Sequence, residues 1–75
     1  MSELVVDARG HHCPVPSLRL RRALEDAAAG ACIRLLATDP MARIDVPHLA
    51  SSIGAEVLEI GEAEGVLSFL VQKSG

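Results

Sequence analysis

Two short segments with the composition of strands, separated by one helical segment, constrain the first half of this chain more than any other feature. Residues 3–8 (ELVVDA) and 32–38 (CIRLLAT) are rich in β-branched and aliphatic residues. Between them the sequence predicts a helix that begins somewhere from Pro14 to Ser17 and runs to about Ala29. Such a connection within one sheet is right-handed in nearly all proteins, so the two strands are expected to be parallel, either adjacent or with one strand between them.

The second half predicts one further helix and a hairpin. A turn at the Asp-Pro pair after the second strand precedes a short helix, with Asp45 as the expected N-cap, Pro47 in the first turn and Gly54 at the end. The segments AEVLEI and VLSFLVQ flank GEAEG and predict a closing β-hairpin. The order is βαβαββ, and two helices suffice to cover one face of four strands. We therefore expect a two-layer α/β sandwich with a mixed four-stranded sheet, as one domain over residues 1–75.

Composition and charge disfavour several classes of protein. The chain is 49% hydrophobic with Phe69 as its single aromatic residue, so the core must be aliphatic. A net charge of −3 without a basic stripe is unfavourable for nucleic-acid binding. No apolar run approaches the ~18 residues of a membrane span, and the N-terminus has no signal-peptide pattern. We expect a cytoplasmic monomer with neither a membrane nor a direct nucleic-acid partner.

The stretch RGHHCPVPS, residues 9–17, contains Cys13, the main candidate for a reactive side chain. In open α/β sheets, reactive groups collect beyond the carboxyl ends of parallel strands, where this stretch and Asp39 are expected. Cys13 would precede or cap the first helix, where unpaired N–H groups and the helix dipole favour a thiolate. Pro14 and Pro16 are tolerated there and stiffen the approach. This predicts a reactive, outward-held Cys13, with the alternative that CPxP merely marks a helix start.

Three other roles for this cysteine are disfavoured. Cys32 begins the second strand, ~20 Å from the edge expected for Cys13, whereas a disulfide needs Cα atoms within about 7 Å. The motif has no second cysteine, so C-x-x-C dithiol chemistry is not available. His11, His12 and Cys13 are adjacent and lack the usual spacing of metal ligands. No metal site is expected, and a metal carrier at these three residues is kept as an alternative.

The first helix has an apolar residue on its predicted solvent side. Leu18 falls opposite the residues expected to pack on the sheet, which are Leu20, Ala23, Leu24 and Ala27. Arg21 lies on the same outer side and has a possible partner at Glu25, four residues on. A partner protein could contact Leu18 together with Arg21. The alternative is an ordinary exposed leucine beside intrahelical ion pairs.

The segments VVDARGHHCPVPSLRLRRAL and LLATDPMARIDVPHLASSIGAEVLE, with the closing hairpin, resemble the TusA (SirA-like) family of small sulfur-carrier proteins over essentially the whole chain. The D-A-R-G-x-x-C-P-x-P opening, A-T-D-P and D-[IV]-P are specific in combination. The resemblance implies a βαβαββ sandwich like the C-terminal domain of translation initiation factor 3. It also implies that Cys13 accepts sulfane sulfur as a persulfide from a cysteine desulfurase or rhodanese-like donor and passes it to a cysteine of an acceptor protein. No cofactor is expected.

The resemblance also assigns roles to residues around the cysteine. The aspartate of the family's D-P motif falls on Asp39, and its docking positions fall on Leu18 and Arg21. We expect Arg9 and Asp39 to shape the electrostatics around Cys13. The outcomes implied by the family include tRNA 2-thiouridine formation, molybdenum-cofactor synthesis and oxidation of reduced sulfur.

The chain departs from the family pattern at two positions. His11 stands where the family usually has leucine, and Ala50 stands where many members have a cysteine. His11 could tune the thiolate or change the choice of partner. The alternative function is a non-catalytic RNA- or protein-binding module of the same fold, whose binding Cys13→Ser would leave unchanged.

Overall fold

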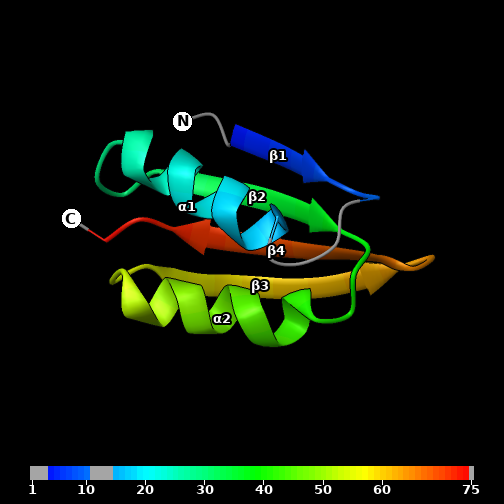
Figure 1. Ribbon diagram of the computed structural model, residues 1–75. Coiled ribbons are helices and arrows are strands. Elements are labelled where there is room, and N and C mark those ends of the chain that lie inside the picture. Colours follow the sequence, from blue (N-terminus) through cyan, green and yellow to red (C-terminus); the bar gives the residue numbers. More distant parts are fainter. Residues whose placement is uncertain (1–3, 11–14, 75) are drawn as a thin grey trace.

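The computed structural model describes residues 4–10 and 15–74, and its elements follow the predicted order βαβαββ (Figure 1). The first two strands agree with the prediction to within one residue. The elements are β1 (Leu4–Ala8), α1 (Val15–Asp26), β2 (Cys32–Ala37), α2 (Ala42–Ser52), β3 (Glu56–Ala63) and β4 (Val66–Gln72).

The four strands form one mixed sheet in the order β1-β2-β4-β3. β1 and β2 are adjacent and parallel, in a register that pairs Leu4 with Ile33 and Ala8 with Ala37. The other two pairings are antiparallel. The prediction of parallel first and second strands is therefore confirmed, and the carboxyl ends of β1 and β2 meet at the same edge of the sheet.

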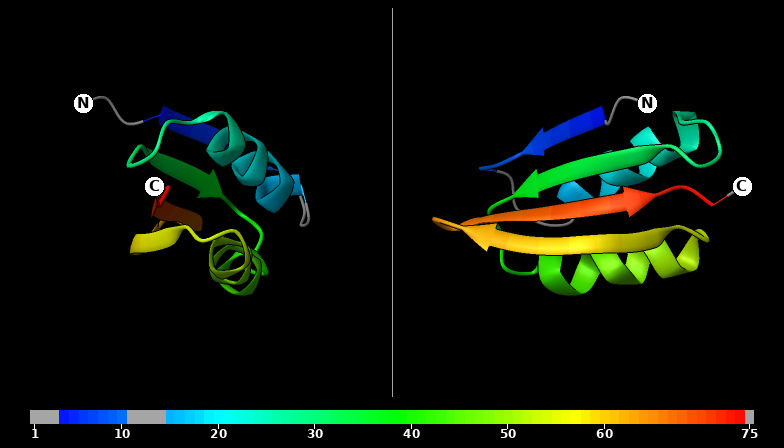
Figure 2. Two further views of the ribbon diagram at one scale, coloured as in Figure 1. Left: turned by 90° about the vertical axis from the view of Figure 1, so that its left-hand side faces the viewer. Right: turned by 180° about the vertical axis from the view of Figure 1, so that it is seen from behind.

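Both helices cover the same face of the sheet, as the two-layer prediction requires. Seen from behind in Figure 2, the four strands lie in front of both helices. The alternation of β2 sets the core, because Ile33, Leu35 and Ala37 are fully buried while Arg34 lies on the open face. There, Arg34 Nη1 donates to Ser68 Oγ at 2.8 Å. The buried core consists of Val6, Ala8, Leu20, Leu24, Ile33, Leu35, Ala37, Ala42, Val46, Ala50, Leu67, Phe69 and Val71.

Helix α1 ends three residues earlier than its apolar pattern predicts. The Ala27 N–H donates to the carbonyl of Leu24 at 3.2 Å, which tightens the last turn. The Lys73 ammonium then lies 2.7 Å from the Ala27 carbonyl oxygen, so a cation from the C-terminal segment satisfies the helix end. This contact joins residues 46 apart in sequence, which the local pattern could not indicate.

Helix α2 begins at Ala42, so the prediction of Asp45 as its N-cap is wrong. The N-cap position is Met41, and in the turn that leads into the helix Asp39 Oδ1 accepts the N–H of Met41 at 2.9 Å while the Asp39 carbonyl accepts the N–H of Ala42 at 3.0 Å. Asp45 instead contributes negative charge to the first turn. Pro47 lies inside the helix rather than at its start.

The closing hairpin is confirmed, with a longer first strand than predicted. β3 runs to Ala63, and the turn to β4 contains only Glu64 and Gly65, with φ of 52° and 79°. Two successive positive φ values are the signature of a type I′ turn, which suits the twist of a hairpin. A register shift between Val57 and Glu59 adds one residue to β3.

Candidate functional site

The carboxyl edge of β1 and β2 brings together the described residues that flank the predicted reactive stretch. Gly10 follows β1, Thr38 and Asp39 follow β2, and α1 begins at Val15. The predicted site residues Cys13 and Pro14, with His11 and His12, lie outside the described residues, and Pro16 is the second residue of α1. Cys32 begins β2 and therefore lies at the opposite edge of the sheet from Gly10, as predicted.

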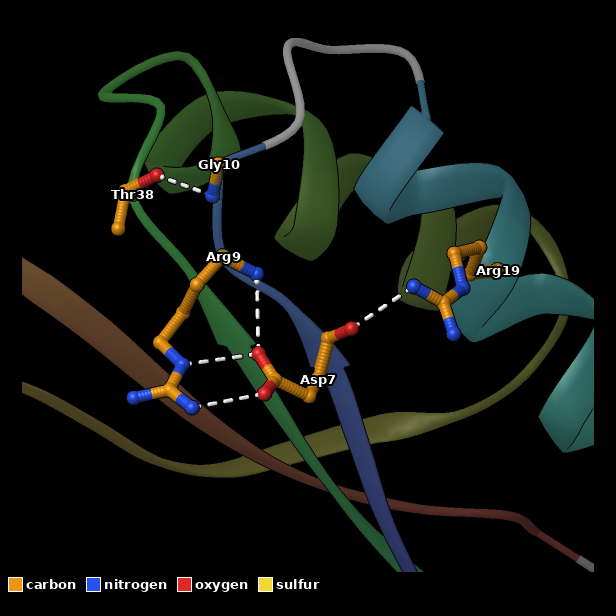
Figure 3. A network of polar contacts seen from close by, with 5 residues as sticks. All are labelled: Asp7, Arg9, Gly10, Arg19 and Thr38. Atoms are coloured by element: carbon orange, nitrogen blue, oxygen red, sulfur yellow. Dashed lines mark hydrogen bonds and ion pairs between the residues drawn. The ribbon is translucent and has the colours of Figure 1, made fainter.

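A hydrogen bond ties the end of β1 to the end of β2. The Gly10 N–H donates to Thr38 Oγ1 at 2.9 Å, across 28 residues of sequence (Figure 3). Gly10 has a φ of +84°, a conformation that residues with a Cβ rarely adopt. The direction in which the chain leaves β1 is thus fixed by a glycine and by one hydroxyl group.

A second contact ties the start of α1 to β1. Arg19 Nη1 donates to the backbone carbonyl of Asp7 at 2.7 Å (Figure 3). Arg19 lies in the second turn of α1, and Asp7 is the penultimate residue of β1. Neither Arg19 nor Thr38 was expected in the site from sequence, because their partners are backbone groups that carry no residue signal.

Arg9, predicted to shape the electrostatics of the site, is paired with a neighbouring carboxylate. Its Nε and Nη2 donate to Oδ1 and Oδ2 of Asp7 at 2.9 and 2.8 Å, and its backbone N–H donates to Oδ1 at 3.1 Å (Figure 3). These hydrogen bonds from Arg9 lower the pKa of Asp7 to about 2 and raise the pKa of Arg9. The field of Arg9 at the site is therefore partly neutralised by Asp7.

The depressed pKa of Asp7 predicts a specific acid response. The folded-state pKa of about 2 lies below the ordinary value of 3.8, so ionised Asp7 stabilises the fold above about pH 4. That contribution is lost as the pH falls towards 2. Titration of the Asp7 carboxyl by NMR should give a midpoint near 2, and Arg9→Gln should return it towards 3.8. A midpoint near 3.8 in the parent protein would contradict the pairing.

Asp39, the second residue predicted to shape the site, is half-buried and has a structural role in the turn. Its side chain and its carbonyl accept the N–H groups that open α2. The residue therefore fixes the path of the chain from Thr38 into the helix. Its predicted electrostatic role near the cysteine stays a prediction.

The predicted docking residues lie on the outer side of α1. Leu18 is 57% exposed, and Arg21 Nε lies 3.4 Å from Glu25 Oε2 in an exposed i,i+4 pair. Such a pair is weak, so Arg21 can exchange Glu25 for a partner's carboxylate at small cost. Two further exposed apolar residues, Met41 and Ile44, lie at the start of α2. Sequence reasoning missed them because it placed the start of that helix at Asp45.

Cavities lie on the described surface both beside this edge and at the opposite end of the sheet. The nearer, about 200 Å³, is lined by Thr38, Pro40, Arg43, Glu62, Gly65 and Leu67. Arg43 and Glu62 form an ion pair with each other there. The larger, about 250 Å³, is lined by Leu24, Glu25, Ile53, Ala55 and Lys73, at the end of α1 away from Gly10. No described cysteine lines either of these two cavities.

Within residues 4–10 and 15–74, no group of three or more His, Cys, Asp or Glu side chains is arranged to hold a metal ion. No helix in that part of the chain has the length and apolar character to cross a membrane.

Comparison with known proteins identifies the family. Residues 4–73 match the family model described as "Sulfurtransferase TusA". A putative sulfur carrier protein of Archaeoglobus fulgidus is 43% identical over 68 residues, which cover 89% of this chain and 88% of the relative. The sulfur carrier protein TusA of Pseudomonas putida strain GB-1 is 34% identical over 95% of this chain and 89% of its own length.

A solved structure shows the same fold. The crystal structure of a SirA-like protein from Desulfitobacterium hafniense superposes with a TM-score of 0.83 at 27% identity, covering 96% of this chain and 99% of that one. The agreement extends over both helices and all four strands. With the family match over residues 4–73 and the relatives above, the chain is a sulfur carrier protein of the TusA (SirA-like) family.

Proposed function

We propose that this carrier accepts sulfane sulfur on Cys13 as a persulfide and delivers it to a cysteine of a partner protein. The observation that carries the proposal is the convergence of Gly10, Thr38 and the start of α1 at one edge of the sheet. Cys13 belongs to the four-residue connection between Gly10 and Val15 in a chain whose family carries sulfur. The connection joins the end of a parallel strand to the first turn of a helix, a common location for reactive groups in α/β folds.

The proposed transfer consists of two thiol-exchange steps. The Cys13 thiolate attacks the terminal sulfur of a donor persulfide, so that a new S–S bond forms at Cys13 and the donor's S–S bond breaks. The donor leaves as a thiolate, and Cys13 becomes Cys13–S–SH. An acceptor thiolate then attacks that terminal sulfur and releases the Cys13 thiolate. The sulfane sulfur passes from one thiolate to the next without a change of oxidation state, so no external oxidant or reductant is consumed.

The local sequence favours the thiolate that both steps need. The first N–H groups of a helix and its dipole stabilise an anion within the first turn, which lowers a thiol's pKa. Pro14 and Pro16 cost little stability at a helix start, because N–H groups at that position have no intrahelical partner. Their rings also limit the backbone conformations of the segment. Arg9 and Asp39 both carry charge at this edge of the sheet. This supports a secondary influence of the two residues on the electrostatics around Cys13.

Partner docking is proposed on the outer side of α1. Leu18 offers an exposed apolar contact, and Arg21 offers a cation whose present pairing is weak. The proposed donor is a cysteine desulfurase or a rhodanese-like protein, and the acceptor is a protein with a reactive cysteine. The pathway can be tRNA thiolation, molybdenum-cofactor synthesis or sulfur oxidation. We expect the relay to work in the cytoplasm, where thiols are kept reduced.

Sulfur loading tests the proposal. The protein is incubated with a cysteine desulfurase and cysteine, and its intact mass is then measured. We expect the gain of a sulfur atom in the parent and in Cys32→Ser, and none in Cys13→Ser. Loading that persists in Cys13→Ser and disappears in Cys32→Ser would place the sulfur on Cys32, at the opposite edge of the sheet, and reject the proposal.

A further inference from the structure

The outer edge of β3 has no strand beside it in the described part of the chain. β3 is the last strand in the order β1-β2-β4-β3, and among the described residues it pairs with β4 alone. In Figures 1 and 2, α2 lies alongside β3 and projects past it on the side away from β4. The backbone N–H and C=O groups on the outer side of such a strand can pair with another extended chain.

Two residues in the second half of β3 fit such a neighbour better than they fit the free fold. Ile60 lies opposite Phe69 on the helix-covered face, yet it is 50% exposed. Gly61 lies opposite Ser68, does not adopt a positive φ, and would meet no atom within 4 Å if it carried a Cβ. Glycine inside a strand weakens it and often marks a place where another backbone approaches closely.

The β-bulge in β3 limits where a neighbouring strand can pair. The register shift lies between Val57 and Glu59, and a bulge bends an edge strand and interrupts its pairing. The regular part of the edge therefore runs from Glu59 to Ala63 and includes both Ile60 and Gly61. This length is ordinary for a strand, so it suits a short extended segment.

The charge of this stretch determines which kind of segment fits. Residues 56–65 contain four glutamates and no Lys or Arg. Arg34 Nη2 lies 3.8 Å from Glu59 Oε1, and the Glu59 side chain is still 66% exposed. Glu62 pairs with Arg43 of α2. Two arginines leave an excess of negative charge, so a second copy of this chain would bring like charge to the edge, whereas a basic segment is attracted to it.

We propose that the edge Glu59–Ala63 is a docking surface for an extended segment of a partner protein in which Lys or Arg alternates with aliphatic residues. Because side chains alternate along a strand, the basic residues lie with Glu59 on the open face and the aliphatic residues lie beside Ile60. Main-chain hydrogen bonds supply the affinity, and the alternating side chains supply the specificity.

This docking surface goes beyond the proposed function and does not depend on Cys13. It is also separate from the outer side of α1, because α1 packs on β1 and β2 whereas β3 forms the other edge of the sheet. A partner at β3 can therefore be bound while α1 remains free.

A titration of the ¹⁵N-labelled protein with a short peptide tests the proposal. The probe is an acetylated and amidated peptide of about eight residues that alternates Lys and Val, a typical strand length. One control peptide has the same sequence with alternate backbone nitrogens methylated, and a second alternates Glu and Val. The protein variants are Glu59→Gln and Ile60→Ala, with Asp26→Asn as the matched control, which removes an exposed carboxylate of α1.

We expect the Lys-Val peptide to shift the amide resonances of Glu59–Ala63 and to slow their hydrogen exchange. Methylation of the peptide should weaken binding by at least about tenfold, because it removes main-chain donors. Glu59→Gln and Ile60→Ala should each weaken binding about threefold, and Asp26→Asn should leave it unchanged. The amide spectrum of each variant without peptide confirms that the fold persists.

Four results would overturn the proposal. The first is an absence of shifts in β3 at millimolar peptide. The second is equal binding of the methylated peptide, which would mean charge attraction without strand pairing. The third is equal binding of the Glu-Val peptide. The fourth is a set of β3 shifts that depends on protein concentration without peptide, which would assign the edge to a second copy. None of these results involves sulfur loading, so each would leave the carrier proposal intact.

Discussion

Phe69→Ala is expected to lower the free energy of unfolding by about 3–5 kcal/mol, the typical cost of removing a large buried ring. Phe69 is fully buried, and it is the only aromatic residue in a core otherwise built from aliphatic side chains. A domain of this size has about 4–11 kcal/mol of stability in total, so the loss is a large fraction of it and would unfold the variant at room temperature if the total lies at the low end of that range.

The matched control for this variant is Ile60→Ala. Ile60 lies opposite Phe69 in the β3–β4 register and is 50% exposed, so its truncation should cost about 1 kcal/mol or less. The chain has no Trp or Tyr, so urea unfolding is followed by far-UV circular dichroism. Ile60 and Phe69 share a face of the sheet and differ in burial, so equal losses in the two variants would contradict the burial of Phe69 in the core.

Leu18→Glu is expected to reduce sulfur uptake from a protein donor by at least about tenfold, because it would place a charge at the centre of the docking surface proposed above, where an apolar side chain would be buried in the complex. Leu18 is 57% exposed in the free protein, so the change should leave the fold intact. The rate of Cys13 alkylation by iodoacetamide, which needs no docking, should stay within about twofold of the parent.

Leu58→Glu provides the matched control for docking. Leu58 is 42% exposed on β3, away from the outer side of α1, and the same change there should leave uptake from the donor unaffected. Equal losses in the two variants would indicate a general effect of added negative charge. Unchanged uptake in Leu18→Glu would remove Leu18 from the docking surface.

The fold was largely predictable because its main constraints are local and periodic. The alternation in β2 separates Ile33, Leu35 and Ala37 from Arg34, and the handedness of crossovers makes β1 and β2 parallel. The predicted start of α2 was wrong because the sequence offers two aspartates, Asp39 and Asp45, of a type suited to an N-cap. Pro47 favoured Asp45, since proline is common in the first turn of a helix. In the structure the N-cap position is Met41, and Asp39 accepts the Met41 N–H in the turn before the helix.

The candidate site was predictable in location but not in its contacts. Strand topology places the ends of β1 and β2 at one edge, and that follows from element order alone. The bonds from Gly10 to Thr38 and from Arg19 to Asp7 span 28 and 12 residues, and each has a backbone group as one partner. Neither periodicity nor motif spacing reports such pairs. The Arg9–Asp7 pairing likewise depends on side-chain geometry that the D-A-R-G motif does not contain.

The most direct test of the sulfur-carrier account is to locate the sulfur and follow its departure. The protein is loaded by a desulfurase and cysteine, separated from the donor, digested, and mapped by mass spectrometry, before and after mixing with an acceptor thiol. We predict one additional sulfur on the peptide that contains Cys13, none on the peptide that contains Cys32, and loss of that sulfur as the acceptor gains it. Sulfur found on Cys32, or sulfur on Cys13 that no thiol can remove, would contradict the account.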